Sequence, residues 1–215
     1  LRLEETDAKK LLPRGVPYPN YTIVEASHDG NGLYSFDRIH TGFIRTGLKV
    51  TKPSKVTLFW DEVLIDGRLK ERRQPHMNMS LELAPGDYLF ETFEPYTLMH
   101  LKLSVEEGDC SLQSVAVRQY VNADTERASF TTDDEEVNRI FRAAVETYRQ
   151  NAVDYFMDCP ERELAGWLFD SYFTARAAYC LSCNTAFEHH FLENFLLPEP
   201  FHNIPERTLP MCHPS

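Results

Sequence analysis

The spacing of apolar residues changes once along this chain, and that change constrains the fold more than any other feature. Up to about residue 120, apolar residues recur at every second position, for example from Ile44 to Val50 and from Val56 to Trp60. Such alternation is typical of strands that bury one face. Turn-forming residues separate the runs, at Lys52-Pro53-Ser54, Asp66-Gly67, Ala84-Pro85-Gly86-Asp87 and Glu107-Gly108-Asp109. Short strands at close spacing predict an antiparallel, two-sheet β-sandwich over residues 21–125, preceded by a linker of residues 1–20.

From about Ala128 the apolar residues follow helical spacing instead. A first helix is predicted to start at the capping box Thr132-Asp133-Asp134-Glu135, where the Thr132 hydroxyl would accept a hydrogen bond from the Glu135 amide. Its apolar stripe comprises Val137, Ile140, Phe141, Ala144, Val145 and Tyr148. Further helices are predicted at about 165–181 and 185–196, the last with Phe187, Phe191 and Phe195 on one face.

Three helices cannot enclose a large active site. We therefore expect residues 126–215 to be the first helices of an α-domain that is incomplete here. A small α-domain packed on the sandwich is the alternative, and the composition is compatible with either.

The composition narrows the classes of partner. The formal net charge is -11 at pH 7 and the pI is about 5.2, which disfavours nucleic acid and anionic membrane surfaces, since both reward an excess of Lys and Arg. The sequence contains no run of about twenty apolar residues, so it predicts no membrane span.

The five cysteines are irregularly spaced, so free thiols are expected. Cys180-x-x-Cys183 followed by Cys212-His213 lacks the spacing of a zinc finger, and neither a metal nor a cofactor is expected. A secreted, periplasmic or cytoplasmic location is equally compatible with the sequence.

Residues 158–170 hold the densest set of chemically useful side chains, namely Asp158, Arg162, Glu163, Trp167 and Asp170. Hydrolysis of a glycoside needs a carboxyl group that lends a proton, further carboxylates that bind hydroxyls, and a flat ring for the apolar face of the sugar. A helix start with scattered surface charge is the competing interpretation. If one helix carries the run, offsets of four and seven place Glu163, Trp167 and Asp170 on one face.

The same run resembles the signature of the α-L-rhamnosidases of glycoside hydrolase family 78. Asp158-Cys159-Pro160-x-Arg162-Glu163, with Gly166-Trp167 and Asp170, agrees with that signature in order, spacing and residue type. The segment from Phe130 to Asn151 is similar to the first helix of the family's catalytic domain, and residues 34–64 are similar to the β-sandwich that precedes it. The resemblance implies a β-sandwich followed by an all-α part that begins an (α/α)6 barrel, which the remainder of the same polypeptide would complete.

The resemblance also implies an activity and a role for each residue of the run. The family consists of inverting glycoside hydrolases that act on terminal α-L-rhamnosides of polysaccharides or plant glycosides. Glu163 would be the general acid, and Asp158 and Asp170 would accept hydrogen bonds from sugar hydroxyls. Arg162 would hold a carboxylate or a sugar oxygen, and Trp167 would stack on the apolar face of the sugar. Trp167 or its neighbours, with a nearby carboxylate, would give Glu163 the apolar cover that a general acid needs. The general base of the family lies beyond Ser215, so these 215 residues alone are expected to hydrolyse nothing.

Several positions depart from the family pattern. Leu168-Phe169 replaces the frequent Thr-Gly, Ser171 replaces Ala, and Leu164-Ala165 replaces Arg-Leu. These positions flank the sugar-facing acids and leave open a related (α/α)6 glycosidase with another sugar specificity. A carbohydrate-binding or structural β-module with a non-catalytic helical remnant is the third interpretation. A remnant has no chemical reason to keep Asp158, Glu163 and Asp170 at these spacings, whereas an active site does.

Overall fold

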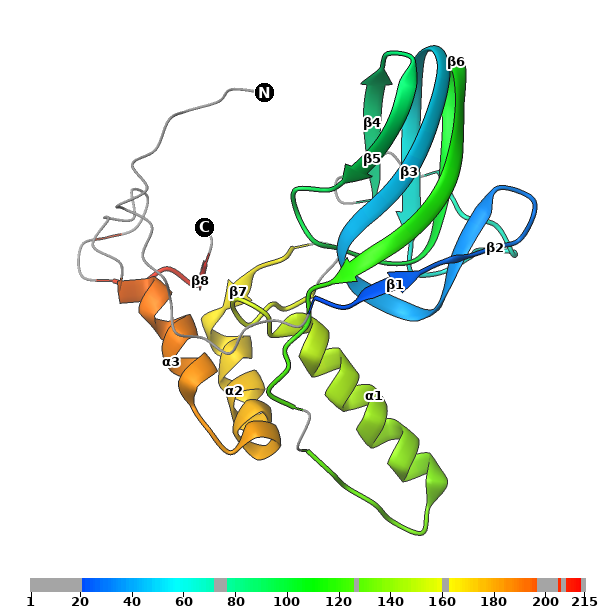
Figure 1. Ribbon diagram of the computed structural model, residues 1–215. Coiled ribbons are helices and arrows are strands. Elements are labelled where there is room, and N and C mark those ends of the chain that lie inside the picture. Colours follow the sequence, from blue (N-terminus) through cyan, green and yellow to red (C-terminus); the bar gives the residue numbers. More distant parts are fainter. Residues whose placement is uncertain are drawn as a thin grey trace.

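The chain changes from sheet to helix along its length (Figure 1). The computed structural model describes residues 21–71, 77–125, 128–159, 163–196, 205 and 208–213. The last long strand ends at Gln119 and the first helix begins at Glu135, which confirms the predicted change near residue 128. The predicted linker of residues 1–20 lies outside the described residues.

Two long strands, β3 (Leu33–Asp61) and β6 (Tyr96–Gln119), carry the antiparallel sheet. Both strands bend, so that each contributes to two layers. In the first layer, residues 100–102 of β6 lie between residues 33–35 and residues 59–61 of β3. The outer strands of this layer are β2 (Ser27–His28) and β4 (Asn78–Leu83).

The second layer is built from the middle of β3 and the second half of β6. Residues 110–118 of β6 lie between residues 43–50 of β3 and the short strand β1 (Ile23–Glu25). On its other edge, β3 pairs with β5 (Gly86–Glu91). The predicted antiparallel β-structure is confirmed, although two long bent strands replace several of the short ones.

Two of the predicted strand ends are bends inside a strand. Lys52-Pro53-Ser54 lies within β3 and Glu107-Gly108-Asp109 lies within β6, where the register between the strands shifts. Each of these segments lets the chain pass from one layer to the other, because a register shift bends a strand without ending its pairing. By contrast, Asp66-Gly67 is a tight turn, with φ of 53° and 72°, and closes the bridge between Ile65 and Arg68 as expected.

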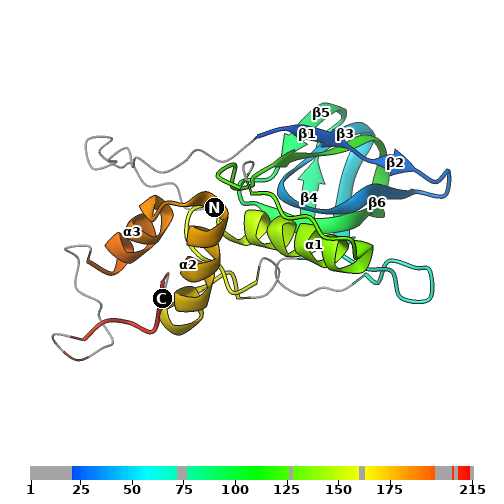
Figure 2. The same ribbon diagram turned by 90° about the horizontal axis from the view of Figure 1, so that it is seen from below.

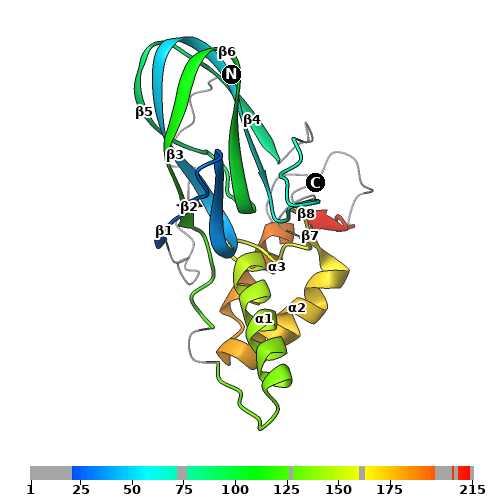
Figure 3. The same cartoon turned by 90° about the vertical axis from the view of Figure 1, so that its right-hand side faces the viewer.

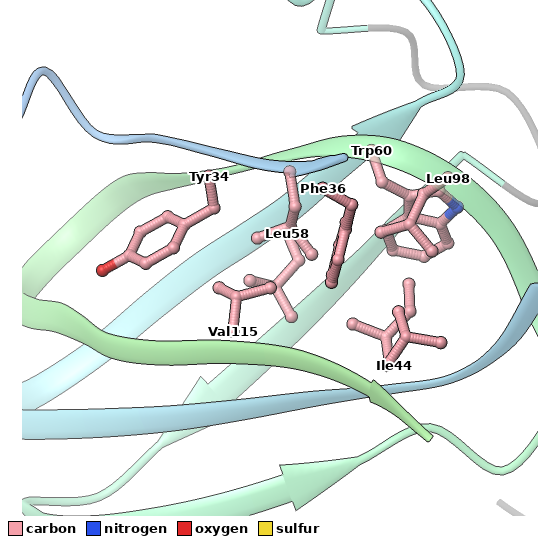
Figure 4. Close-up of a cluster of buried hydrophobic side chains, with 9 residues drawn as sticks. Tyr34, Phe36, Ile44, Leu58, Trp60, Leu98 and Val115 are labelled. Atoms are coloured by element: carbon pink, nitrogen blue, oxygen red, sulfur yellow. The ribbon is translucent and has the colours of Figure 1, made fainter. Parts of the chain in front are cut away.

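The hydrophobic core of the sheet lies between the two layers (Figure 4). The first layer contributes Tyr34, Phe36, Leu58, Trp60, Leu98 and Leu101, and the second contributes Ile44, Val115 and Val117. The alternating residues Ile44, Thr46, Leu48 and Val50 are all buried, which confirms the predicted inner face of this run.

The helix α1 (Glu135–Asn151) has its N-cap two residues later than predicted. The Asp134 carboxylate accepts hydrogen bonds from the amides of Glu136 (2.8 Å) and Val137 (3.4 Å), so Asp134 is the N-cap. The predicted cap at Thr132 is wrong. A carboxylate is a stronger acceptor than a hydroxyl and suits the positive end of the helix dipole.

The C-terminal end of α1 is fixed on the sheet. The buried Gln150 side chain accepts a hydrogen bond from the Thr41 hydroxyl (2.9 Å) and donates one to the Ile39 carbonyl (3.2 Å). Asn122, which follows β6, donates its side-chain N–H to the Ala152 carbonyl (2.6 Å). Seen from below (Figure 2), α1 accordingly lies next to the strands. These bonds place the segment after α1 at the junction of sheet and helices.

The helices α2 (Leu168–Ser182) and α3 (Ala186–Glu193), with the 3-10 turn η2 (Asn194–Leu196), share a second core. This core comprises Tyr148, Ala152, Phe156, Ala175, Ala178, Phe187, Phe191 and Phe195, which confirms the predicted phenylalanine face of the third helix. Seen from the side (Figure 3), the sheet forms one part of the molecule and the three helices the other.

The predicted start of the second helix near residue 165 is wrong. Gly166–Trp167 forms the short strand β7, which pairs with β8 (Cys212–His213). The helix begins only after this pairing, where the Leu168 amide donates to the Met211 carbonyl (2.9 Å). A sequence pattern cannot show this difference, because the partner strand lies more than forty residues away.

Large apolar side chains remain exposed on the helices. Of the predicted α1 stripe only Tyr148 is buried, and Ile140 is 63% exposed. On α2, Phe169 is 78% exposed, and Tyr172, Phe173 and Tyr179 are also exposed. Contiguous apolar surface of this kind marks a face that another element covers. In the part of the chain that the structure describes, no helix is long and apolar enough to cross a membrane.

Candidate active site

The predicted active-site run forms a closed loop between α1 and α2. The Asp158 amide donates to the Ala165 carbonyl (3.0 Å), and the Asp158 carboxylate accepts from the Ala165 amide (3.1 Å). Inside the loop, the Cys159 thiol donates to Asp158 (3.5 Å) and accepts from the Glu163 amide (3.5 Å). Asp158 therefore closes the base of the loop with one carboxylate oxygen and leaves the other near the thiol. Arg162 lies outside the described residues.

Tyr155 fixes the far side of this loop. Leu164 adopts a left-handed backbone conformation (φ 52°), and its carbonyl accepts a hydrogen bond from the Tyr155 hydroxyl (2.5 Å). Burial raises the pKa of Tyr155 to about 12, and the charges of Asp154 and Asp158 add to the effect. The hydroxyl therefore keeps its proton at neutral pH and acts as a donor.

Removing this donor should loosen the loop. The Tyr155→Phe variant of the 215-residue chain is expected to have a free energy of unfolding lowered by about 1 kcal/mol, since the half-buried Leu164 carbonyl loses its hydrogen bond. Tyr179→Phe, at a position that is 54% exposed, is the control and should change the value by less than about 0.5 kcal/mol. Urea denaturation of both variants measures the difference. Equal values would show that the Tyr155 hydroxyl does not hold the loop.

Glu163 and Trp167 meet across a turn and not along a helix. Glu163 lies in the turn before β7, and Trp167 is the N-cap residue of α2, so the predicted helical face through Glu163 is wrong. The indole Nε1–H of Trp167 donates to Glu163 Oε2 (2.9 Å). Glu163 is exposed among the described residues, so Trp167 contacts it by a hydrogen bond and not as the expected apolar cover.

Asp158 and Asp170 line one small pocket. This pocket, here called the α2 pocket, has a volume of about 230 Å³ and is completed by Phe156, Met157, Ser171, Phe173 and Thr174. Asp170 is exposed in the first turn of α2, where its charge suits the helix dipole. The structure therefore brings together the two carboxylates that the sequence assigned to sugar hydroxyls, although they lie twelve positions apart.

Glu163 faces a different and larger space. This junction pocket, of about 420 Å³, is lined on the helical side by Val153, Asp154, Tyr155, Met157, Glu163 and Leu164. On the sheet side it is lined by Thr41, Phe43, Phe93, Glu94, Pro95 and Tyr120. Met157 lines both pockets. The three acids of the run therefore lie in two pockets that adjoin at Met157, with Glu163 in one and Asp158 and Asp170 in the other.

The sheet-side residues of the junction pocket were not predicted from the sequence. Phe93-Glu94-Pro95 lies in the loop between β5 and β6, Phe43 belongs to β3, and Tyr120 directly follows β6. The one local signal was Phe93, two positions before Pro95 in a hairpin loop, since such a ring has little to pack against within its own hairpin.

The charged residues that line the two pockets are all acidic. They are Glu94, Asp154 and Glu163 in the junction pocket and Asp158 and Asp170 in the α2 pocket. Such a lining disfavours anionic ligands and suits neutral molecules that carry hydroxyl groups. Among the described residues, no three His, Cys, Asp or Glu side chains are grouped so that they could hold a metal ion.

Comparison with known proteins agrees with this arrangement. Residues 125–210 match the family model described as the bacterial alpha-L-rhamnosidase 6 hairpin glycosidase domain. A search of curated proteins found no match. The matched segment contains the whole Asp158–Asp170 run and all three helices.

Solved structures share the fold over most of this chain. A rhamnosidase from Klebsiella oxytoca with rhamnose bound has 16% identity and a TM-score of 0.64, and the match covers 84% of this chain and 37% of that one. A GH78 rhamnosidase of Bacillus sp. GL1 has 19% identity and a TM-score of 0.66, with coverage of 84% and 19%. An α-L-rhamnosidase from Aspergillus terreus has 18% identity and a TM-score of 0.60, with coverage of 85% and 22%. The chain spans between 19% and 37% of these proteins.

The fold and the matched segment define a glycoside hydrolase-like chain. An antiparallel sheet followed by a few helices is consistent with the arrangement in the solved rhamnosidases. Within this class the similarity is of rhamnosidase type, and the resemblance to α-L-rhamnosidases that the sequence predicted is confirmed.

Proposed function

We propose that the polypeptide carrying this chain is an inverting glycoside hydrolase that removes terminal α-L-rhamnosyl groups from polysaccharides or plant glycosides. One observation carries the proposal: Glu163, hydrogen-bonded by Trp167, lies beside the pocket of Asp158 and Asp170, inside the segment that matches the rhamnosidase domain. A carbohydrate is then the expected partner, in keeping with the acidic lining of both pockets.

In the proposed mechanism Glu163 protonates the glycosidic oxygen. The Trp167 N–H donates to Oε2 and orients the carboxyl group that would carry the proton. Asp170 and the second oxygen of Asp158 would accept hydrogen bonds from sugar hydroxyls in the α2 pocket, and Arg162 would donate to a carboxylate or a sugar oxygen. Inversion requires a second carboxylate at roughly 6.5–9.5 Å to activate water. We assign it to a part of the polypeptide outside these 215 residues.

The same proposal accounts for the exposed helical faces. Residues 21–125 would form a β-sandwich domain, and residues 126–215 the first helices of an (α/α)6 barrel. Phe169, Tyr172 and Tyr179 on α2 are too apolar for a free surface, and further helices of the barrel would cover them.

A related (α/α)6 glycosidase with another sugar specificity is the second candidate. Phe169 stands where many family members carry Gly, and its ring contacts Phe173 (centroids 5.6 Å apart), which lines the α2 pocket. Through this contact the larger side chain would change the position of Phe173 and with it the shape of the α2 pocket. A binding module with a non-catalytic helical remnant fits less well, because the structure keeps Asp158 and Asp170 in one pocket.

The test follows the product of hydrolysis by the full-length polypeptide. With 4-nitrophenyl α-L-rhamnoside we expect β-L-rhamnose as the first product in proton NMR spectra, before mutarotation mixes the anomers, because water attacks the face opposite the leaving group. α-L-Rhamnose as the first product would contradict inversion. Release of 4-nitrophenol from another glycoside but not from the rhamnoside would favour the second candidate.

A further inference from the structure

The loop between β5 and β6 presents an exposed aromatic residue on a hydrogen-bonded backbone. The buried Thr92 accepts a hydrogen bond from the Ile44 amide (3.0 Å) and donates one to the Glu94 carbonyl (2.8 Å), and its own amide donates to the Ile44 carbonyl (3.0 Å). The next residue, Phe93, is 86% exposed and lines the junction pocket. Because Thr92 joins the loop to β3 and also holds the Glu94 carbonyl, the backbone that carries Phe93 is preorganised, and less entropy is lost when a ligand contacts the ring.

The opposite part of the sheet-side wall is also aromatic and fixed. The rings of Phe43 and Tyr120 pack edge to face, with centroids 5.6 Å apart. The Arg118 guanidinium lies over the Phe43 ring, 4.3 Å from its centroid, and is itself held by Glu91 (2.7 Å). Burial raises the pKa of Tyr120, which keeps this wall uncharged at neutral pH. Such rings favour a ligand with a flat or apolar ring face.

The role of a general acid determines which pocket would hold the sugar and which would hold the leaving group. A general acid must contact the glycosidic oxygen, which is bonded both to the sugar that is cleaved and to the leaving group. Glu163 lines the junction pocket together with the aromatic residues of the sheet, and this pocket shares Met157 with the α2 pocket, which holds the two carboxylates Asp158 and Asp170. If the sugar occupies the α2 pocket, the leaving group has to extend into the junction pocket.

We propose that the junction pocket is the leaving-group subsite and that the β-sheet part of the chain builds its specificity. Phe93, Phe43 and Tyr120 would hold the ring of a neutral aryl aglycone, while Glu94 disfavours anionic ones. The assignment rests on the proposed function, since it needs Glu163 as the general acid. It gives the sheet a direct part in substrate choice, beyond support for the helices.

The experiment compares two substrates in the full-length polypeptide. 4-Nitrophenyl α-L-rhamnoside has an aryl leaving group, whereas α-L-rhamnosyl fluoride has none. In Phe93→Ala, the ratio of kcat/KM for the aryl substrate to kcat/KM for the fluoride is expected to fall about tenfold, through loss of the ring contact. Leu89→Ala is the matched control, because Leu89 is 71% exposed on the neighbouring strand β5 and lines neither pocket.

The outcomes separate the two proposals. A ratio that falls in Phe93→Ala and not in Leu89→Ala supports the subsite. An unchanged ratio, or an equal fall in both variants, overturns the subsite while the proposed function stands. If the unmodified polypeptide hydrolyses neither substrate, the proposed function fails, and the subsite fails with it.

Discussion

Replacing Glu163 with glutamine in the full-length polypeptide is expected to lower kcat/KM for methyl α-L-rhamnoside by roughly 10²–10⁴-fold. Glutamine has nearly the same shape, and its side-chain carbonyl can still accept the hydrogen bond from Trp167 Nε1, so the loop should keep its structure. What the variant lacks is the proton for the glycosidic oxygen. Steady-state kinetics with the two proteins at equal concentration measures the loss.

The leaving group separates proton donation from other roles of Glu163. Fluoride departs without prior protonation, so the loss in Glu163→Gln should be much smaller for α-L-rhamnosyl fluoride than for the methyl glycoside. Glu136→Gln, an exposed acid in the first turn of α1, is the control and should leave both rates unchanged. An equal loss on both substrates would assign Glu163 to binding or folding, and no loss on either would place the proton donor elsewhere.

The sequence allowed most of the elements of the fold to be predicted, because burial leaves a periodic pattern. The alternation from Ile44 to Val50 marked an inner face of the sheet, and the spacing of Phe187, Phe191 and Phe195 marked the face of α3 that packs in the helical core. Periodicity failed where the outcome depended on a distant partner. Gly166–Trp167 continues a helical pattern, yet it pairs with β8 instead.

The residues of the candidate site were likewise predicted only in part from the sequence. Residue types and spacing predicted Asp158, Glu163, Trp167 and Asp170, since these lie in one short run. The pattern could not show that one carboxylate oxygen of Asp158 would accept a hydrogen bond from the Ala165 amide and so close the loop. Nor could it show that the β5–β6 loop and Glu163 line the same pocket, although they are about seventy residues apart in the chain. That proximity depends on how α1 is fixed on the sheet.

The second large effect is expected at Phe156, where the helical core reaches the active-site loop. Phe156 is 1% exposed, and its ring packs against Phe187 (4.8 Å between centroids) and Phe191 (5.3 Å). Phe156→Ala should lower the free energy of unfolding of the 215-residue chain by about 3–5 kcal/mol, because the site loses apolar contacts and keeps a cavity. Urea denaturation followed by helical circular dichroism measures this value.

Phe169→Ala is the matched comparison, because it makes the same chemical change at a position that is 78% exposed on α2. In the 215-residue chain it should change the free energy of unfolding by less than about 0.5 kcal/mol. An equal loss in the two variants would contradict the core assigned to these helices.

The same two variants test the barrel in the full-length polypeptide. If further barrel helices cover the exposed face of α2, Phe169→Ala should there cost about 3 kcal/mol or more, approaching the loss at Phe156. A Phe169→Ala variant that stays neutral at full length would show that this face is free, and that these helices do not begin a barrel.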